Sequence, residues 1–85
     1  MNIIPGGRVA TVDLASMKQG EEGKVVRVGG GFGLQRRLEA LGVRMGVKIK
    51  KVSGHFMRGP VIARMGNTEV AIGWGMARRI MVEVL

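Results

Sequence analysis

The chain has 85 residues, of which 46% are apolar, so it supports one domain with a hydrophobic core but leaves no room for a deep catalytic cleft. It contains no cysteine, which excludes disulfides and thiolate metal sites. Fourteen Lys and Arg residues against six Asp and Glu residues give a net charge of +8. A charge of this sign attracts nucleic acid, anionic lipid or an acidic protein surface, and it does not choose among them.

The N-terminal half predicts an arm, a strand and a short helix. Residues 1–10 form the arm, which would add an edge strand and contains a Pro-Gly-Gly turn. Residues 22–28 read as the first core strand, and the glycine-rich segment 29–33 joins it to the helix. Leu34, Leu38 and Leu41 recur at i, i+4 and i+7, so we expect all three to pack on the sheet. Gly42 follows as the left-handed residue that ends the helix.

The C-terminal half predicts four further strands. Residues 47–52 alternate apolar and basic side chains at their start, as a strand with one wet face does. Gly66 and Asn67 give a two-residue hairpin turn between strands 61–65 and 68–72. Residues 73–79 form about one helical turn before the last strand at 80–85. These elements predict a mostly β fold: a small SH3-like barrel of about five strands, with one short helix after the first core strand and a helical turn before the last strand, in a domain that spans 11–85.

Neither a catalytic site nor a nucleotide site is predicted, so we expect a protein that is not an enzyme. The glycine-rich segment lacks the final glycine of a dinucleotide fingerprint and the Gly-Lys-Ser/Thr of a P-loop. One histidine and scattered hydroxyl groups do not supply a nucleophile with its base. The single histidine, His55, has no clustered carboxylates beside it in the sequence. We therefore expect no firmly bound cofactor and only weak binding of Fe(II) or another transition metal ion through His55.

A surface for a protein partner is the main functional candidate. Phe56, Met57 and Arg58 lie at the tip of a loop, and Trp74 stands between two glycines. Large side chains on glycine-rich turns are typical of interface anchors, although they can also fold back over the barrel end as a plug. Four cations in the strand region would steer an acidic partner toward these anchors: Lys48, Lys50, Lys51 and Arg64.

The alternative function is a basic nucleic-acid-binding small barrel. Six Lys and Arg residues and no acid lie between Glu39 and Glu69. The aromatic residues Phe32, Phe56 and Trp74 lie outside the basic strand, however, and an oligonucleotide platform needs stacking groups within it. Nucleic acid is therefore not the expected partner.

The chain resembles the FeoA family over residues 12–84. The resemblance rests on four groups of residues in this order: Leu14, Met17, Gly20, Gly23 and Val25; Arg36, Arg37, Leu38, Leu41, Gly42 and Gly46; Gly59, Pro60 and Val61; and Val70, Ala71, Ile72, Ala77, Ile80 and Val82. It implies a cytosolic accessory of FeoB, the membrane Fe(II) transporter with a GTP-binding domain, and a loose association with transition metal ions. Two departures are the long N-terminal arm, which would offer an edge for self-association, and the lack of an acidic residue beside Pro60.

We expect a cytoplasmic protein that meets the inner membrane only through its partner. No leader pattern and no apolar run of about 20 residues are visible in the sequence. A third interpretation follows from the same resemblance, since the domain also occurs at the C-terminus of metal-dependent repressors. Nothing in this sequence resembles a helix-turn-helix, so the chain would be only the accessory half of such a sensor.

Overall fold

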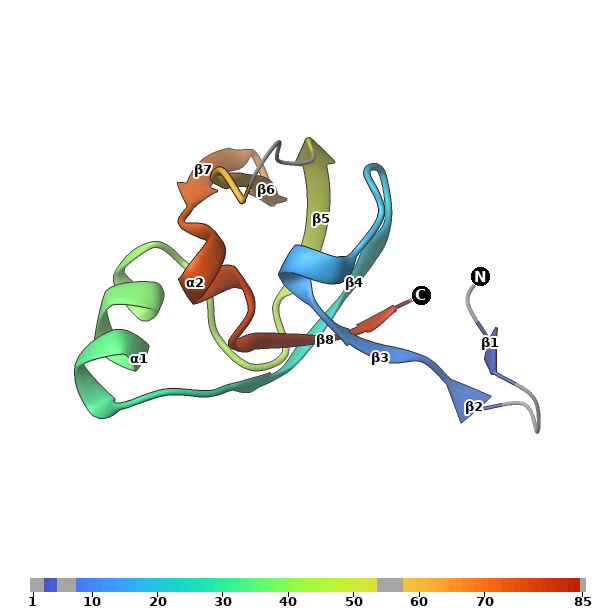
Figure 1. Ribbon diagram of the computed structural model, residues 1–85, viewed down its shortest axis with the longest axis horizontal. Coiled ribbons are helices and arrows are strands. Elements are labelled where there is room, and N and C mark those ends of the chain that lie inside the picture. The colour runs from blue at the N-terminus through green and yellow to red at the C-terminus, as the bar shows by residue number, and fades with distance from the viewer. Residues whose placement is uncertain (1–2, 5–7, 54–57, 85) are drawn as a thin grey trace.

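Strands are the main regular structure in the computed structural model, which describes residues 3–4, 8–53 and 58–84 (Figure 1). Within these residues the elements follow in the order β1 (Ile3–Ile4), β2 (Arg8–Val9), β3 (Thr11–Asp13), the 3-10 helix η1 (Leu14–Ser16), β4 (Glu22–Val28), α1 (Phe32–Ala40), β5 (Lys48–Ser53), β6 (Val61–Met65), β7 (Thr68–Ile72), α2 (Trp74–Ala77) and β8 (Ile80–Val84). The predicted fold class, mostly β with a helix after β4 and a helical turn before β8, is confirmed.

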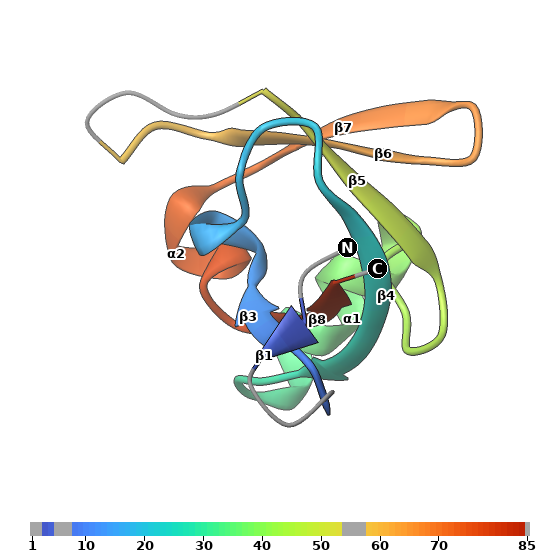
Figure 2. The same cartoon turned by 90° about the vertical axis from the view of Figure 1, so that its right-hand side faces the viewer.

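The main sheet has six antiparallel strands in the order β3-β8-β4-β5-β6-β7. Figure 2 shows β4 curving around one side of the molecule, with β5, β6 and β7 crossing above. In the described residues β3 and β7 are the outer strands and do not pair with each other, so the sheet is not a closed barrel. The expected arm contributes β1 and β2, which pair in a separate two-stranded sheet.

The sequence prediction of five strands missed β3. This strand has three residues and pairs with β8, placing Val12 opposite Val82. A three-residue segment is too short to show the alternation from which strands are recognised. The predicted hairpin, in contrast, is present: β6 and β7 join through Gly66 and Asn67, with Met65 opposite Thr68.

Helix α1 ends in a Schellman motif, and this ending decides which side chains it buries. Gly42 has a φ of +95°, and its N–H donates to the carbonyl of Glu39 at 2.9 Å. The N–H of Val43 donates to the carbonyl of Leu38, also at 2.9 Å, so these two side chains are brought together. Both are fully buried, whereas Leu41 at the C-cap is 36% exposed. The prediction that Leu41 packs on the sheet was wrong, because the turn at Gly42 places Val43 in the core instead.

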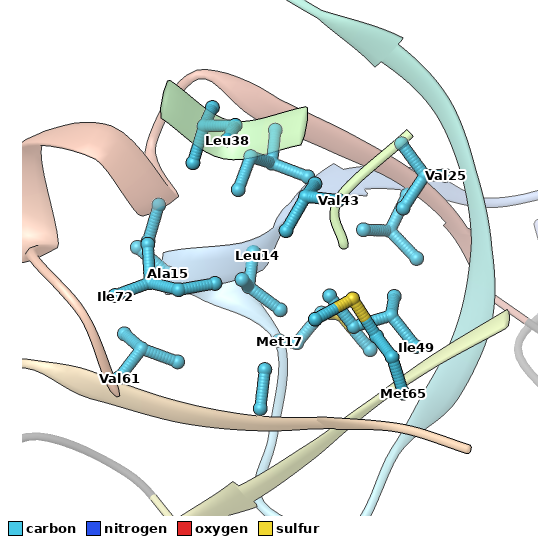
Figure 3. Packing of buried hydrophobic residues seen from close by; sticks show 14 residues of the cluster. Leu14, Ala15, Met17, Val25, Leu38, Val43, Ile49, Val61, Met65 and Ile72 are labelled. Carbon is cyan, nitrogen blue, oxygen red and sulfur yellow. The ribbon is translucent and has the colours of Figure 1, made fainter. Parts of the chain in front are cut away.

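The core lies between the curved sheet and the helices α1, η1 and α2. Figure 3 shows Leu38 from α1 and Leu14 from η1 converging with side chains from β4, β5 and β6. Its fully buried members are Leu14, Val25, Leu38, Val43, Ile49, Val61, Ala63, Ile72, Ala77, Ile80 and Val82. This core fixes the positions of β5 and α2, which carry most of the described candidate site residues.

Candidate partner-binding surface

Two of the predicted strand cations, Lys50 and Arg64, lie in a row of charges with a glutamate at each end. Glu22 of β4 stands opposite Lys50 of β5, Lys50 opposite Arg64 of β6, and Arg64 opposite Glu69 of β7. Residues directly opposite one another in neighbouring strands share a face of the sheet, so these four charges form one cross-strand row. The Nε of Arg64 donates to Glu69 Oε2 at 3.0 Å, and Lys48 pairs with Glu22 at 3.1 Å. Two of the steering cations are therefore already neutralised.

Lys51 does not belong to this surface at all. Its side chain is 3% exposed, and its Nζ donates to the carbonyl oxygens of Ala15 at 2.8 Å and Met17 at 2.6 Å. Burial lowers the pKa of the Lys51 ammonium, while Asp13 and Glu21 act in the opposite direction. The prediction that Lys51 steers a partner was wrong, because Lys51 shares the inner face of β5 with Ile49, two residues away.

Arg58 and Trp74 are brought together by the fold. The guanidinium carbon of Arg58 lies 5.0 Å from the centroid of the Trp74 ring system, and that of Arg78 lies 4.8 Å from it. Both are cation–π distances. Figures 1 and 2 agree that the segment after residue 57 runs beside α2, where Trp74 is the first residue. Trp74 itself is half-buried and packs against the core, so its ring is a fixed platform.

Three predicted site residues, His55, Phe56 and Met57, lie outside the residues that the structure describes. Over residues 3–4, 8–53 and 58–84, no group of three His, Asp or Glu side chains is placed to hold a metal ion. The metal role of His55 and the anchor roles of Phe56 and Met57 therefore remain predictions.

A groove between β4 and α1 was not foreseen from the sequence. It has a volume of about 280 Å³ and is lined by Val26, Arg27, Val28, Gln35, Glu39, Val43, Arg44 and Met45. The amide of Gln35 donates to the carbonyl of Val28 at 3.3 Å, which ties the helix to the end of the strand. Met45 is 70% exposed at its edge. Residues before, within and after α1 line this groove, so no local pattern in the sequence indicates it.

The described elements define a small, mostly β domain with two short α-helices. A family model described as the FeoA domain matches residues 12–84. The chain is also 40% identical over 70 residues to "Putative Fe(2+) transport protein A" of Methanocaldococcus jannaschii, which covers 82% of this chain and 83% of that protein. This chain belongs to the FeoA family, as its resemblance predicted.

Solved structures give the same result for the fold. A crystal structure of an iron uptake regulatory protein (FeoA) is 36% identical, with a TM-score of 0.85, and covers 89% of this chain and 100% of that one. The SH3-like fold predicted from the sequence is thus confirmed. A manganese-dependent transcriptional repressor superposes with a TM-score of 0.83 over 96% of this chain and 49% of its own. At 20% identity, this second likeness shows the fold alone.

Every helix in the described part of the chain is too short or too polar to span a bilayer.

Proposed function

We propose that this chain is a non-enzymatic accessory of ferrous iron uptake that docks on the cytosolic face of a FeoB-type transporter and modulates it. The observation that carries the proposal is membership of the FeoA family, together with the relative whose name refers to Fe(2+) transport. In this proposal the chain acts in the cytoplasm and reaches the inner membrane through the transporter. Residues 11–85 form the docking domain, and the arm of residues 1–10 is an edge for self-association.

The charge distribution supports an acidic partner. The net charge is +8, and the two ion pairs found within the described residues involve Lys48 and Arg64 on the sheet. Over that part of the chain, the arginines of the α1 and α2 side have no carboxylate partner: Arg27, Arg36, Arg37, Arg44, Arg58, Arg78 and Arg79. We therefore assign the docking role to Arg58 and Trp74, with Phe56 and Met57 of the adjoining loop, and give Lys48, Lys50 and Arg64 only a long-range steering role.

Metal association has a smaller place in this proposal. In this proposal the imidazole of His55 binds Fe(II) only weakly, because a tight site needs several converging ligands. The iron is the transporter's cargo, and the accessory acts on the transporter rather than on the ion.

The test is capture of the purified protein by the immobilised cytosolic domain of the FeoB-type transporter, at low and at physiological salt. If the arginines near α1 and α2 make the contact, the protein should be captured at both salt concentrations. Capture should be weaker at the higher concentration, because salt screens exposed charges. A matched control replaces Lys50 by Gln on the sheet row, which should change capture less than Arg78→Gln does. Absence of capture at both salt concentrations would contradict the proposal.

Nucleic acid binding is the second candidate, favoured by the net charge of +8. Each neutralised phosphate releases a counterion, so binding through the arginines would fall steeply with salt. We expect weak, sequence-independent binding that disappears near physiological salt. Micromolar or tighter binding to a short DNA duplex at that salt concentration would favour this candidate over docking.

A further inference from the structure

The Arg58, Trp74 and Arg78 side chains form one unit, named here the arginine clamp. The two guanidinium carbons lie 5.0 Å and 4.8 Å from the same ring centroid, so both planar groups are held near one ring. Within the described residues neither guanidinium forms an ion pair or a hydrogen bond, although each carries five N–H donors. Two oriented cations with unused donors are a receptor for an anion.

The backbone of Arg58 is a second observation about this site. Arg58 has a φ of +64°, and it is the one non-glycine residue with positive φ in the described part of the chain. Residues with a Cβ rarely adopt this conformation, and a glycine would adopt it without strain. The strained backbone turns Arg58 to a position where its guanidinium meets the ring of Trp74. Strain of this kind clusters at binding sites.

The surface beside the clamp is hollowed. A depression of about 270 Å³ is lined by Gly75, Arg78 and Arg79, directly after Trp74 in the chain. A Cβ built at Gly75 would meet nothing within 4 Å, so the floor of the depression is open. Its volume suits one or two side chains of a partner, and its lining adds the cation of Arg79 to those of the clamp.

We propose that the arginine clamp binds the carboxylate side chains of an acidic segment of the partner protein. Planar guanidinium groups fixed against a ring match carboxylates in a bidentate geometry. A lipid surface is the less suitable occupant, because Trp74 is half-buried against the core and its ring cannot insert among headgroups as an exposed tryptophan does. This inference rests on the proposed docking function, since the partner would be the transporter's cytosolic domain.

Trp74 is the single tryptophan of the chain, so its fluorescence reports directly on the clamp. The probe is a capped hexaglutamate peptide, titrated while Trp74 emission is recorded. We expect a saturable change in emission for the wild-type protein and an affinity roughly tenfold weaker for the double variant Arg58→Lys/Arg78→Lys, which keeps both charges but loses the planar donors. The matched control is Arg36→Lys, because Arg36 also lies over an aromatic ring, that of Phe32 at 5.7 Å.

Three outcomes overturn the clamp. They are equal affinities of the double variant and the wild type, an equal loss in Arg36→Lys, and an emission change with phosphatidylserine vesicles but not with the peptide. Should the double variant melt early, Arg58→Gly replaces it. Glycine suits a φ of +64°, so that variant is expected to fold, and unchanged peptide affinity in it would also overturn the clamp.

The same variants separate this inference from the proposed function. Capture of the wild type and the double variant by the transporter domain to the same extent would leave docking standing and remove the clamp from it. Peptide binding that depends on Arg58 and Arg78, without capture by the transporter domain, would support the clamp and contradict the proposed partner.

Discussion

The ammonium of Lys51 donates a hydrogen bond to the carbonyl oxygen of Met17 at 2.6 Å, across 34 residues of sequence. A second bond to Ala15 holds the same ammonium at 2.8 Å. Both carbonyls belong to the turn formed by η1 and its C-cap, so the Lys51 ammonium bridges two carbonyls of this buried turn. A charged side chain is therefore part of the link between β5 and the N-terminal segment.

Replacement of Lys51 by Met should destabilise the protein by about 2–4 kcal/mol. The variant keeps the apolar stem but removes the two buried hydrogen bonds that the Lys51 ammonium donates to the carbonyls of Ala15 and Met17. Lys50→Met is the matched control, because Lys50 lies on the outer face, and it should stay within about 0.5 kcal/mol of the wild type. Urea unfolding measures both, and equal losses would show that Lys51 contributes only as a surface charge.

The stability difference between the wild type and Lys51→Met should grow as the pH rises. Burial lowers the pKa of Lys51 from its ordinary value of 10.5 in the folded protein. Between the folded and the unfolded pKa the unfolded chain binds more protons, so the free energy of unfolding rises with pH in that window. Unfolding curves at about pH 7.5 and about pH 10 test the sign. A difference that shrinks toward high pH would mean that folding favours the charged ammonium.

Leu38→Ala should cost about 2–4 kcal/mol, because Leu38 is fully buried between α1 and the sheet. Leu41→Ala should cost less than about 1 kcal/mol, since Leu41 is 36% exposed beyond the helix end. Thermal melting of the two variants, which carry the same chemical change three residues apart, compares the sites directly. Similar losses at both positions would contradict the described helix ending.

Two glycine substitutions should change the free energy of unfolding in opposite directions. A Cβ at Gly23 would lie 2.5 Å from the carbonyl oxygen of Glu83 and would also meet Val82, so Gly23→Ala should destabilise by about 2–3 kcal/mol. Gly33 is in α1 with nothing within 4 Å of its would-be Cβ, so Gly33→Ala should stabilise by about 0.5–1 kcal/mol. Chemical denaturation gives both values. A stable Gly23→Ala variant would mean that β4 and β8 are less closely apposed.

Fe(II) or Zn(II) should bind no more tightly than tens of micromolar, with most of the binding lost in His55→Ala. The reason is that one imidazole alone is a weak ligand set. Calorimetric titration under anaerobic conditions measures the affinity. Submicromolar binding, or binding that survives the substitution, would reveal a site built from other groups.

Local signals in the sequence predicted much of the fold. Gly42 marks the end of α1 because a left-handed residue is needed there, and the hairpin at Gly66 and Asn67 follows from the requirements of a tight turn. In β5 the spacing of Ile49 and Lys51 already placed both on one face, but a lysine on an inner face is plausible only when its acceptors are known. Those acceptors lie 34 and 36 residues away, and no local pattern reveals them.

The candidate site was predictable only in its parts. Arg58 and Trp74 each stood out beside glycines, but their contact joins a loop to a helix across the fold, and Arg78 was not foreseen as the second cation. The strand cations were misjudged for a related reason. Pairing of Arg64 with Glu69 depends on the register of β6 and β7, which charge counting along the chain does not include.

An amide chemical-shift titration tests most directly whether the protein docks through the arginine clamp. The labelled protein is titrated with the unlabelled cytosolic domain of the FeoB-type transporter. We predict that the largest shifts fall on Arg58, on residues 73–79 and on the indole N–H of Trp74, while the amide signals of Lys48, Lys50 and Arg64 shift little. Absence of any shifts, or shifts centred on the charge row of β5 and β6 or on the groove between β4 and α1, would contradict it.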